Sequence, residues 1–257
     1  MLRSATDLQG YTVRGVDGDV GEVTDLYFDD KAWIVRYLVV RTGGWLSGRE
    51  VLLTPLVCEQ PDWDNAVFPV SLTKEQIENS PEANLHKPVS RQQEVALHQY
   101  YGWAPYWTMA VPSAPPRPMP ITMTPPVNPV PAPPAPDMVT AEAEDTAVDP
   151  HLRSLDEVTG YHIAAEDGDI GHVETFVVDD ASWSIMYMVV DTRNWLPGRK
   201  VLVALQWVQQ IAWIDRRVYV DLHQETIKNS PEYDPDEPLE RAYEERLYDY
   251  YGRPRYW

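Results

Sequence analysis

The chain has 257 residues and a formal net charge of −19, because 40 Asp and Glu outnumber 21 Lys and Arg. A surface this acidic repels phosphate backbones and anionic lipid headgroups, which disfavours direct binding to nucleic acid or to a membrane and favours a basic protein as partner. The single cysteine, Cys58, excludes a disulfide framework within the chain.

Neither export nor membrane spanning is expected from the sequence. The most apolar stretch, 33–40, is short and contains Arg36, and the first repeat begins at Leu2 without a basic and apolar leader. Together with the lone cysteine, these features lead us to expect a cytoplasmic protein.

Residues 2–107 return as residues 152–257 at a constant offset of 150. About 42 of the aligned pairs are identical, roughly 40%, which indicates a tandem duplication. We therefore predict one domain at 1–107, a connector at 108–150 and a second domain at 151–257. Each copy also serves as a control for the other, because chemistry found in only one copy is not required by the fold.

The first part of each copy has the pattern of short strands separated by turns. In the first copy, Asp17-Gly18 predicts a tight hairpin turn and Asp29-Asp30 predicts the next turn. Residues 33–40 are largely apolar at both side-chain parities, which predicts a strand covered on both faces at the centre of the unit. Further strands are predicted at 51–53 and 68–72. With the same signals repeated in the second copy, we predict a mainly β protein with two small antiparallel barrels.

The last part of each copy changes to a helical pattern. Apolar residues at 97, 100 and 101 are three and four positions apart, and Gly102 follows as a C-terminal stop. We predict a helix from about Ser90 to these tyrosines, and its counterpart from about Glu240. A single helical turn is predicted near 75–77, ended by the following proline.

The connector at 108–150 holds 13 of the 24 prolines and ends in an acidic run. Proline removes backbone donors and favours an extended polyproline conformation, so this composition favours a semi-rigid spacer without a core of its own. The alternative interpretation is a proline-rich docking ligand.

Four motifs of the first copy occur in an order that resembles the PRC-barrel domain. They are Gly18-Asp19-Val20-Gly21, the Asp29-Asp30 turn, Arg36-Tyr37-Leu38-Val39 and Gly48-Arg49-Glu50-Val51-Leu52-Leu53. The resemblance covers about residues 2–80 and 152–230. This family includes the cytoplasmic part of the photosynthetic reaction centre H chain and the barrel of the RimM-type ribosome maturation factor. The first repeat begins without the membrane helix of the one or the N-terminal domain of the other, so the resemblance implies only a binding module that docks on larger assemblies.

The inventory of reactive residues predicts that the chain is not an enzyme. No His, Cys or Lys is identical in both copies, and neither copy has a phosphate-binding glycine loop. Catalysis by proton transfer or nucleophilic attack depends on such residues, so we predict no catalytic residue and no cofactor. The aspartates at 17, 19, 29 and 30 lack the spacing and terminal Glu of a calcium loop, and Asp is common in turns, so no metal site is predicted.

The candidate interaction residues are the aromatic residues at the end of each copy and one arginine ahead of a core strand in each. Large amphipathic rings are enriched at protein interfaces, but the same rings could fold back onto their own small barrel. Each arginine is predicted to pair with a turn aspartate, the alternative being a partner's carboxylate. The set comprises Tyr100, Tyr101, Trp103, Tyr106, Trp107, Tyr250, Tyr251, Tyr256, Trp257, Arg49 and Arg199.

The first functional hypothesis is a bivalent, non-enzymatic adaptor with two PRC-type barrels, each followed by a C-terminal helix, on a proline-rich tether. It would dock on an assembly such as a membrane complex of the photosynthetic reaction-centre type. One alternative is a self-contained structural or stress-related protein in which barrels pair within or between chains. Another is a ribosome-assembly factor that acts through a ribosomal protein, and the sequence does not choose between these partners.

Overall fold

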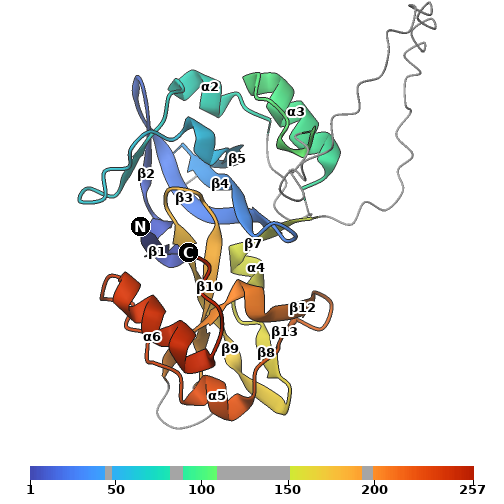
Figure 1. Ribbon diagram of the computed structural model, residues 1–257. Helices are drawn as coiled ribbons and strands as arrows, with labels where there is room; N and C mark the ends of the chain where they lie inside the picture. Colours follow the sequence, from blue (N-terminus) through green and yellow to red (C-terminus); the bar gives the residue numbers. More distant parts are fainter. Residues whose placement is uncertain (44–47, 82–88, 109–150, 193–198) are drawn as a thin grey trace, which may run out of the picture.

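The structure is a computed structural model that describes residues 1–43, 48–81, 89–108, 151–192 and 199–257. The described residues are mainly β, with two sheets and a few short helices (Figure 1). All but the first residue of the predicted connector at 108–150 lies outside them, so its role as spacer or ligand stays a prediction.

The two copies follow nearly the same order of elements. In the first copy these are β1 (Leu2–Ser4), α1 (Ala5–Leu8), β2 (Thr12–Gly15), β3 (Gly18–Asp29), β4 (Ile34–Thr42), β5 (Arg49–Leu53), η1 (Pro55–Val57), β6 (Val67–Pro69), α2 (Lys74–Glu78), α3 (Arg91–Tyr101) and η2 (Tyr106–Thr108). In the second copy they are β7 (Leu152–Ser154), α4 (Leu155–Val158), β8 (His162–Ala165), β9 (Gly168–Asp179), β10 (Ile185–Asp191), β11 (Lys200–Ala204), η3 (Leu205–Trp207), β12 (Val208–Ala212), β13 (Arg217–Val220), α5 (Gln224–Lys228) and α6 (Arg241–Tyr251).

Local chemistry explains where the helices of the first copy begin and end. A capping box starts α3, in which the Ser90 hydroxyl accepts from the Gln93 amide and the Gln93 side chain accepts from the Ser90 amide. At the other end, Gly102 takes the left-handed conformation at φ 69°, which costs glycine little. Thr73 and Gln76 form the same box at α2.

The sheets differ from the predicted antiparallel barrels. Their hydrogen-bonded orders are β5-β4-β3-β2-β6 and β11-β10-β9-β8-β13-β12, and the pairs β2–β6 and β8–β13 are parallel. No closed barrel is found in the described part of the chain. In the second copy β11 and β12 are the two ends of the strand order and are not paired with each other, although only η3 separates them in the chain. The prediction that β4 is the central strand was wrong, because β3 pairs with β2, β4 and β7.

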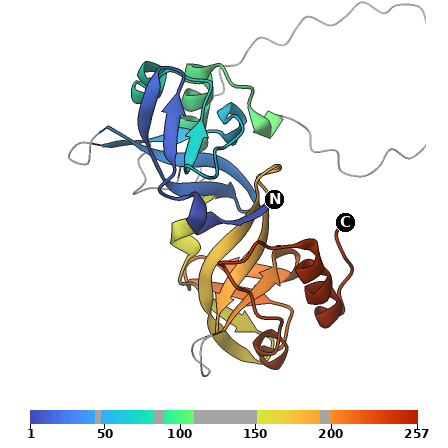
Figure 2. The ribbon, with the colours of Figure 1, turned by 90° about the vertical axis from the view of Figure 1, so that its left-hand side faces the viewer.

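Each sheet receives one strand from the other copy, and this strand lies off the main strand order. Strand β1 pairs with β9 through Leu2–Asp179, Arg3–Val178 and Ser4–Val177, whereas β7 pairs with β3 in the equivalent register. Figures 1 and 2 show both crossings at the junction between the two halves. This is an exchange of identical elements, as in domain-swapped dimers, but within one chain. The two copies are therefore interlocked and not joined by the connector alone.

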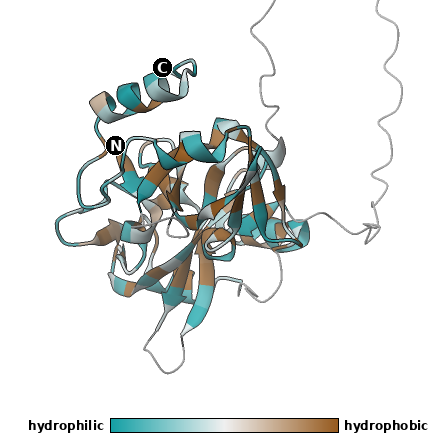
Figure 3. Cartoon of the chain, turned by 90° about the horizontal axis from the view of Figure 1, so that it is seen from below, coloured by the Kyte–Doolittle hydropathy of each residue, from teal (hydrophilic) through white to brown (hydrophobic). Residues whose placement is uncertain are grey.

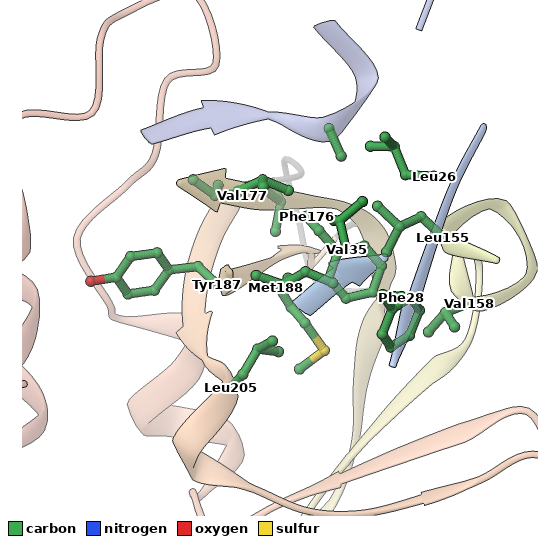
Figure 4. Packing of buried hydrophobic residues seen from close by; sticks show 14 of the residues in the cluster. Leu26, Phe28, Val35, Leu155, Val158, Phe176, Val177, Tyr187, Met188 and Leu205 are labelled. Carbon is green, nitrogen blue, oxygen red and sulfur yellow. The ribbon is translucent and has the colours of Figure 1, made fainter. Parts of the chain in front are cut away.

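The exchange creates a core that belongs to both copies. Phe28 and Phe176 approach with ring centroids 6.3 Å apart, and one buried cluster contains apolar side chains from both repeats. Figure 4 shows Phe28, Leu155 and Phe176 together in this cluster. Hydrophobic residues concentrate on the strands in Figure 3, whereas the helices and turns carry more polar residues. Burial of this shared apolar surface stabilises the interlocked arrangement.

Two tryptophans mark the point where the turns of the two copies meet. Trp33 and Trp183 have left-handed backbones, at φ 54° and 57°, which is unusual for residues other than glycine. Each carbonyl accepts a hydrogen bond from the other copy at 2.8 Å, Trp33 from the Ile185 amide and Trp183 from the Val35 amide. These cross-copy bonds hold the two turns, and hence the two indoles, in place.

Candidate protein-interaction site

A buried glutamate anchors the aromatic tail of the first copy. Glu94 in α3 is fully buried, and its Oε1 accepts hydrogen bonds from the Tyr37 hydroxyl at 3.1 Å and the Tyr106 hydroxyl at 2.6 Å. Arg91 Nη1 lies 2.7 Å from Glu94 Oε2. Burial raises the pKa of the Glu94 carboxyl above its usual range, although both hydroxyls and the arginine oppose this effect. The carboxyl thus ties helix α3 to β4 and to the tail.

The second copy repeats this network with the equivalent residues. Glu244 accepts from the Tyr187 hydroxyl at 2.6 Å and from the Tyr256 hydroxyl at 2.7 Å, and Arg241 lies 2.9 Å away. The arginines are then covered by the last tryptophan of each tail, with 4.3 Å from Arg91 to the Trp107 ring and the same distance in the second copy. Both tails therefore fold back onto their own copy.

The predicted interaction residues of the tails divide by exposure. Tyr101, Trp103, Tyr106 and Trp107 are half-buried and Tyr251 is buried. The exposed rings are Tyr100, Tyr250, Tyr256 and Trp257, each about two-fifths exposed. The hydroxyls of the first two nevertheless donate to backbone carbonyls of α2 and α5 at 2.9 Å. Their role in contacts with a partner stays a prediction.

An apolar groove lies between the tail of the first copy and the turn of the second. Its volume is 560 Å³, and we call it groove 1. Leu56 stands at its edge with 89% of its surface exposed. The ring of His98, whose pKa burial lowers, lies at its wall, and His98 Nε2 is 2.8 Å from the Tyr37 hydroxyl. The remaining walls include Tyr106 and Trp183, so the exchange helps to build the groove.

The second copy has an equivalent but smaller cavity, groove 2, of 400 Å³. Trp33 of the first copy contributes to it, as Trp183 does to groove 1. Gln206 replaces the exposed leucine, and its Nε2 donates to the Tyr248 hydroxyl at 2.7 Å. Trp207, where the first copy has a valine, is buried against Tyr248. Tyr248 and Trp207 are larger than His98 and Val57 at the equivalent positions, which is consistent with the smaller volume of groove 2.

The predicted pairing of Arg49 and Arg199 with turn aspartates was wrong. Arg49 donates to the carbonyls of Glu78 at 2.7 Å and Ser80 at 3.0 Å, where α2 ends. Arg199 donates to the Ser230 carbonyl at 3.3 Å and lies 3.5 Å from Glu232. Cations beside the last carbonyls of a helix satisfy acceptors that the helix leaves open.

The described residues contain no group of three or more His, Cys, Asp or Glu placed to hold a metal ion. Burial raises the pKa of the Cys58 thiol to about 12, so it is protonated at neutral pH and poorly suited to nucleophilic attack. Within the same residues, no helix has the length and apolar character needed to span a membrane.

Comparison with known proteins identifies one domain in this chain. The model of the PRC-barrel domain family matches residues 2–65. Residues 2–65 form a PRC-barrel domain. The PRC-barrel match begins at β1, the strand that pairs with the second copy, and ends before β6.

A bacterial relative matches part of this chain. An uncharacterized protein of Deinococcus radiodurans is 38% identical over 74 residues, which cover 28% of this chain. The chain spans about a quarter of that relative's length, since the match covers 26% of it. PRC-barrel domains are generally protein-interaction modules.

Sequence reasoning missed both the buried glutamate and the groove. Glu94 is one of the polar residues identical in both copies, and it lies three residues before Leu97 and seven before Tyr101, on the apolar face of its helix. A charged residue in that position is a signal of a buried network. The groove had no such signal, because it is assembled from two copies through the strand exchange.

Proposed function

We propose that the chain is a non-enzymatic protein-binding module in which two interlocked PRC-type units present groove 1 to a partner protein. The observation that carries the proposal is Leu56, which is 89% exposed at the edge of an apolar groove of 560 Å³. Exposed apolar side chains beside such a groove are typical of binding surfaces. The partner supplies an apolar or aromatic side chain that enters the groove.

The partner's own surface is basic around that side chain. The net charge of −19 favours approach of a basic protein and disfavours direct contact with nucleic acid. The family resemblance supports two settings, a membrane complex of the photosynthetic reaction-centre type and a ribosome-assembly particle reached through a ribosomal protein. In both settings the chain acts in the cytoplasm without catalysis, cofactor or metal.

The test is comparative capture from a native lysate with three forms of the full chain. Leu56→Glu places a charge at groove 1, and Gln206→Glu places the same charge at the equivalent exposed position of groove 2. We expect one defined protein to be retained by the parent and by Gln206→Glu and to be lost with Leu56→Glu. With that protein purified, Leu56→Glu should raise Kd about tenfold or more, as expected for a central apolar contact.

Thermal melts of the three forms are the control for this comparison. They should coincide, because both substituted side chains lie at the surface. Capture of the same proteins by all three forms would show that groove 1 is not the binding surface.

A second function, a self-contained structural protein, is favoured by the strand exchange and the shared core. An interlocked chain needs no partner to cover its apolar strands. If no protein depends on Leu56 for capture and the chain alone is fully stable in dilute solution, this second function becomes the better one.

A further inference from the structure

The two exchange junctions are equivalent in position but different in chemistry. Where β1 and α1 join the second sheet, the Thr6 hydroxyl donates to the Thr175 hydroxyl at 2.7 Å, which is a neutral contact. Where β7 and α4 join the first sheet, the position equivalent to Thr175 is Asp25. At this pair of equivalent positions one junction therefore has an ionisable group and the other has a hydroxyl. The β1 junction also carries an ion pair, between Arg3 Nε and Asp180 Oδ2 at 2.8 Å.

Asp25 binds the beginning of α4 in the other copy. Its side chain is buried, with 8% of the residue exposed, and it lies at a β-bulge in β3. Its Oδ1 accepts from the Leu26 amide at 2.7 Å and from the Asp156 amide at 3.3 Å, and its Oδ2 accepts from the Ser154 hydroxyl. The same hydroxyl accepts from the Glu157 amide at 3.0 Å. The carboxyl of one copy thus caps a helix of the other.

The charges around this carboxyl oppose its ionisation. On α4, Asp156 and the nearby Glu157 lie toward the carboxyl. On its own strand the neighbour is Tyr27, which also interacts electrostatically with Glu50 of β5. The cation on β7, Arg153, lies toward Asp30 and Glu157, and no described Lys or Arg forms an ion pair with Asp25. Burial, with Asp156 adding to it, raises the pKa of Asp25 to about 7, although its three hydrogen bonds oppose the shift.

We infer that the Asp25–Ser154 junction is a pH-sensitive latch, which holds β7 and α4 on the first sheet while the carboxyl is protonated and loosens when it ionises. The Thr6–Thr175 contact at the other junction does not titrate, so β1 and α1 lack this response. Neutral solution thus loosens the interlock on one side only, because a buried carboxylate without a cation is costly.

The direction of the pH effect follows from the difference between the pKa of Asp25 in the closed state and in water. The pKa of Asp25 is about 7 in the closed state and 3.8 when the carboxyl is free in water, so its stabilising effect is complete below pH 3.8 and is lost as pH rises through 7. Between about pH 6 and about pH 8, the equilibrium constant for opening should rise about tenfold.

Amide hydrogen exchange on the full chain tests the latch at these two pH values, with rates corrected for intrinsic exchange. Amides paired between β7 and β3 should show the tenfold rise, whereas those between β1 and β9 should not. Asp25→Thr, which copies the other junction, should remove the rise, and the near-isosteric Asp25→Asn should do the same if the threonine variant folds poorly. Thr175→Asp should transfer the rise to β1.

Two results would overturn the latch. One is an equal change at both junctions in the parent chain, which would indicate global opening. The other is a tenfold rise at β7 that persists in Asp25→Asn, because that side chain does not ionise in this range.

Discussion

Grooves 1 and 2 occupy equivalent positions, yet their walls differ. At groove 1 the positions 56 and 98 hold leucine and histidine, and at groove 2 the equivalents are Gln206 and Tyr248, which are hydrogen-bonded to each other. The cavity volume falls from 560 to 400 Å³ between them. The buried network beside each groove, in contrast, uses the same residue types in both copies.

This contrast separates the buried network, which is present in both copies, from the groove walls, which differ between them. Tyr37, Arg91, Glu94 and Tyr106 are identical to their counterparts and hold the tail in place. The groove residues that differ between the copies do not form the same hydrogen bonds in both copies, as the Gln206–Tyr248 bond illustrates. A difference of this kind in the groove walls is what we expect if one copy binds a partner and the other supports it.

The largest expected effect concerns the shared network. Glu94→Ala leaves two tyrosine hydroxyls and Arg91 without their acceptor, and should lower the free energy of unfolding by about 4 kcal/mol. Glu244→Ala should cost less, about 3 kcal/mol, because Arg241 has 52% of its side chain exposed, compared with 31% for Arg91, and water can replace its partner. Urea unfolding followed by circular dichroism measures both.

Glu94→Gln is the matched control, since it keeps the shape and an acceptor and should recover most of the loss. Equal losses for the two alanine variants would mean that the exposure of the arginine does not distinguish the copies.

Much of the local structure was predictable from the repeat and its periodicity. The hairpin at Asp17-Gly18 forms between β2 and β3, and the apolar stretch from Trp33 forms β4. These signals are local, because turn residues and alternating side chains act on their neighbours. The parallel pair β2–β6 was not predictable, since it joins strands far apart in sequence.

The site was harder to predict for a related reason. Trp183 lines groove 1 only because the turns of the two copies meet, and no pattern within one copy reports that contact. The predicted acceptor of Arg49 was wrong because the sequence shows where charged side chains are but not which backbone carbonyls lie at a helix end. Both errors concern contacts that depend on tertiary structure.

A smaller effect separates the two exchanged strands. Leu152 of β7 is 2% exposed and packs against Tyr27, Tyr37 and Val39, so Leu152→Ala should lower the free energy of unfolding by about 3 kcal/mol. Leu2 of β1 is only partly buried, so Leu2→Ala should cost about 1 kcal/mol. Guanidinium unfolding of the full chain measures the difference, and similar losses would contradict the idea that the two strands are unequally packed.

The smallest effect concerns the arginines that close α2 and α5. Arg49 makes two hydrogen bonds to carbonyls, at 2.7 and 3.0 Å, so Arg49→Ala should cost about 1.5 kcal/mol. Among the described residues, Arg199 donates one longer bond to a carbonyl, at 3.3 Å, and its ion-pair partner Glu232 is 63% exposed, so Arg199→Ala should cost about 0.7 kcal/mol. Arg49→Lys is the control for charge, because lysine cannot span both carbonyls and should recover less than half of the loss. If Arg49→Lys had the same stability as the parent chain in thermal melts, the positive charge near the helix end would be the stabilising feature. The pair of hydrogen bonds to two carbonyls would then not be needed.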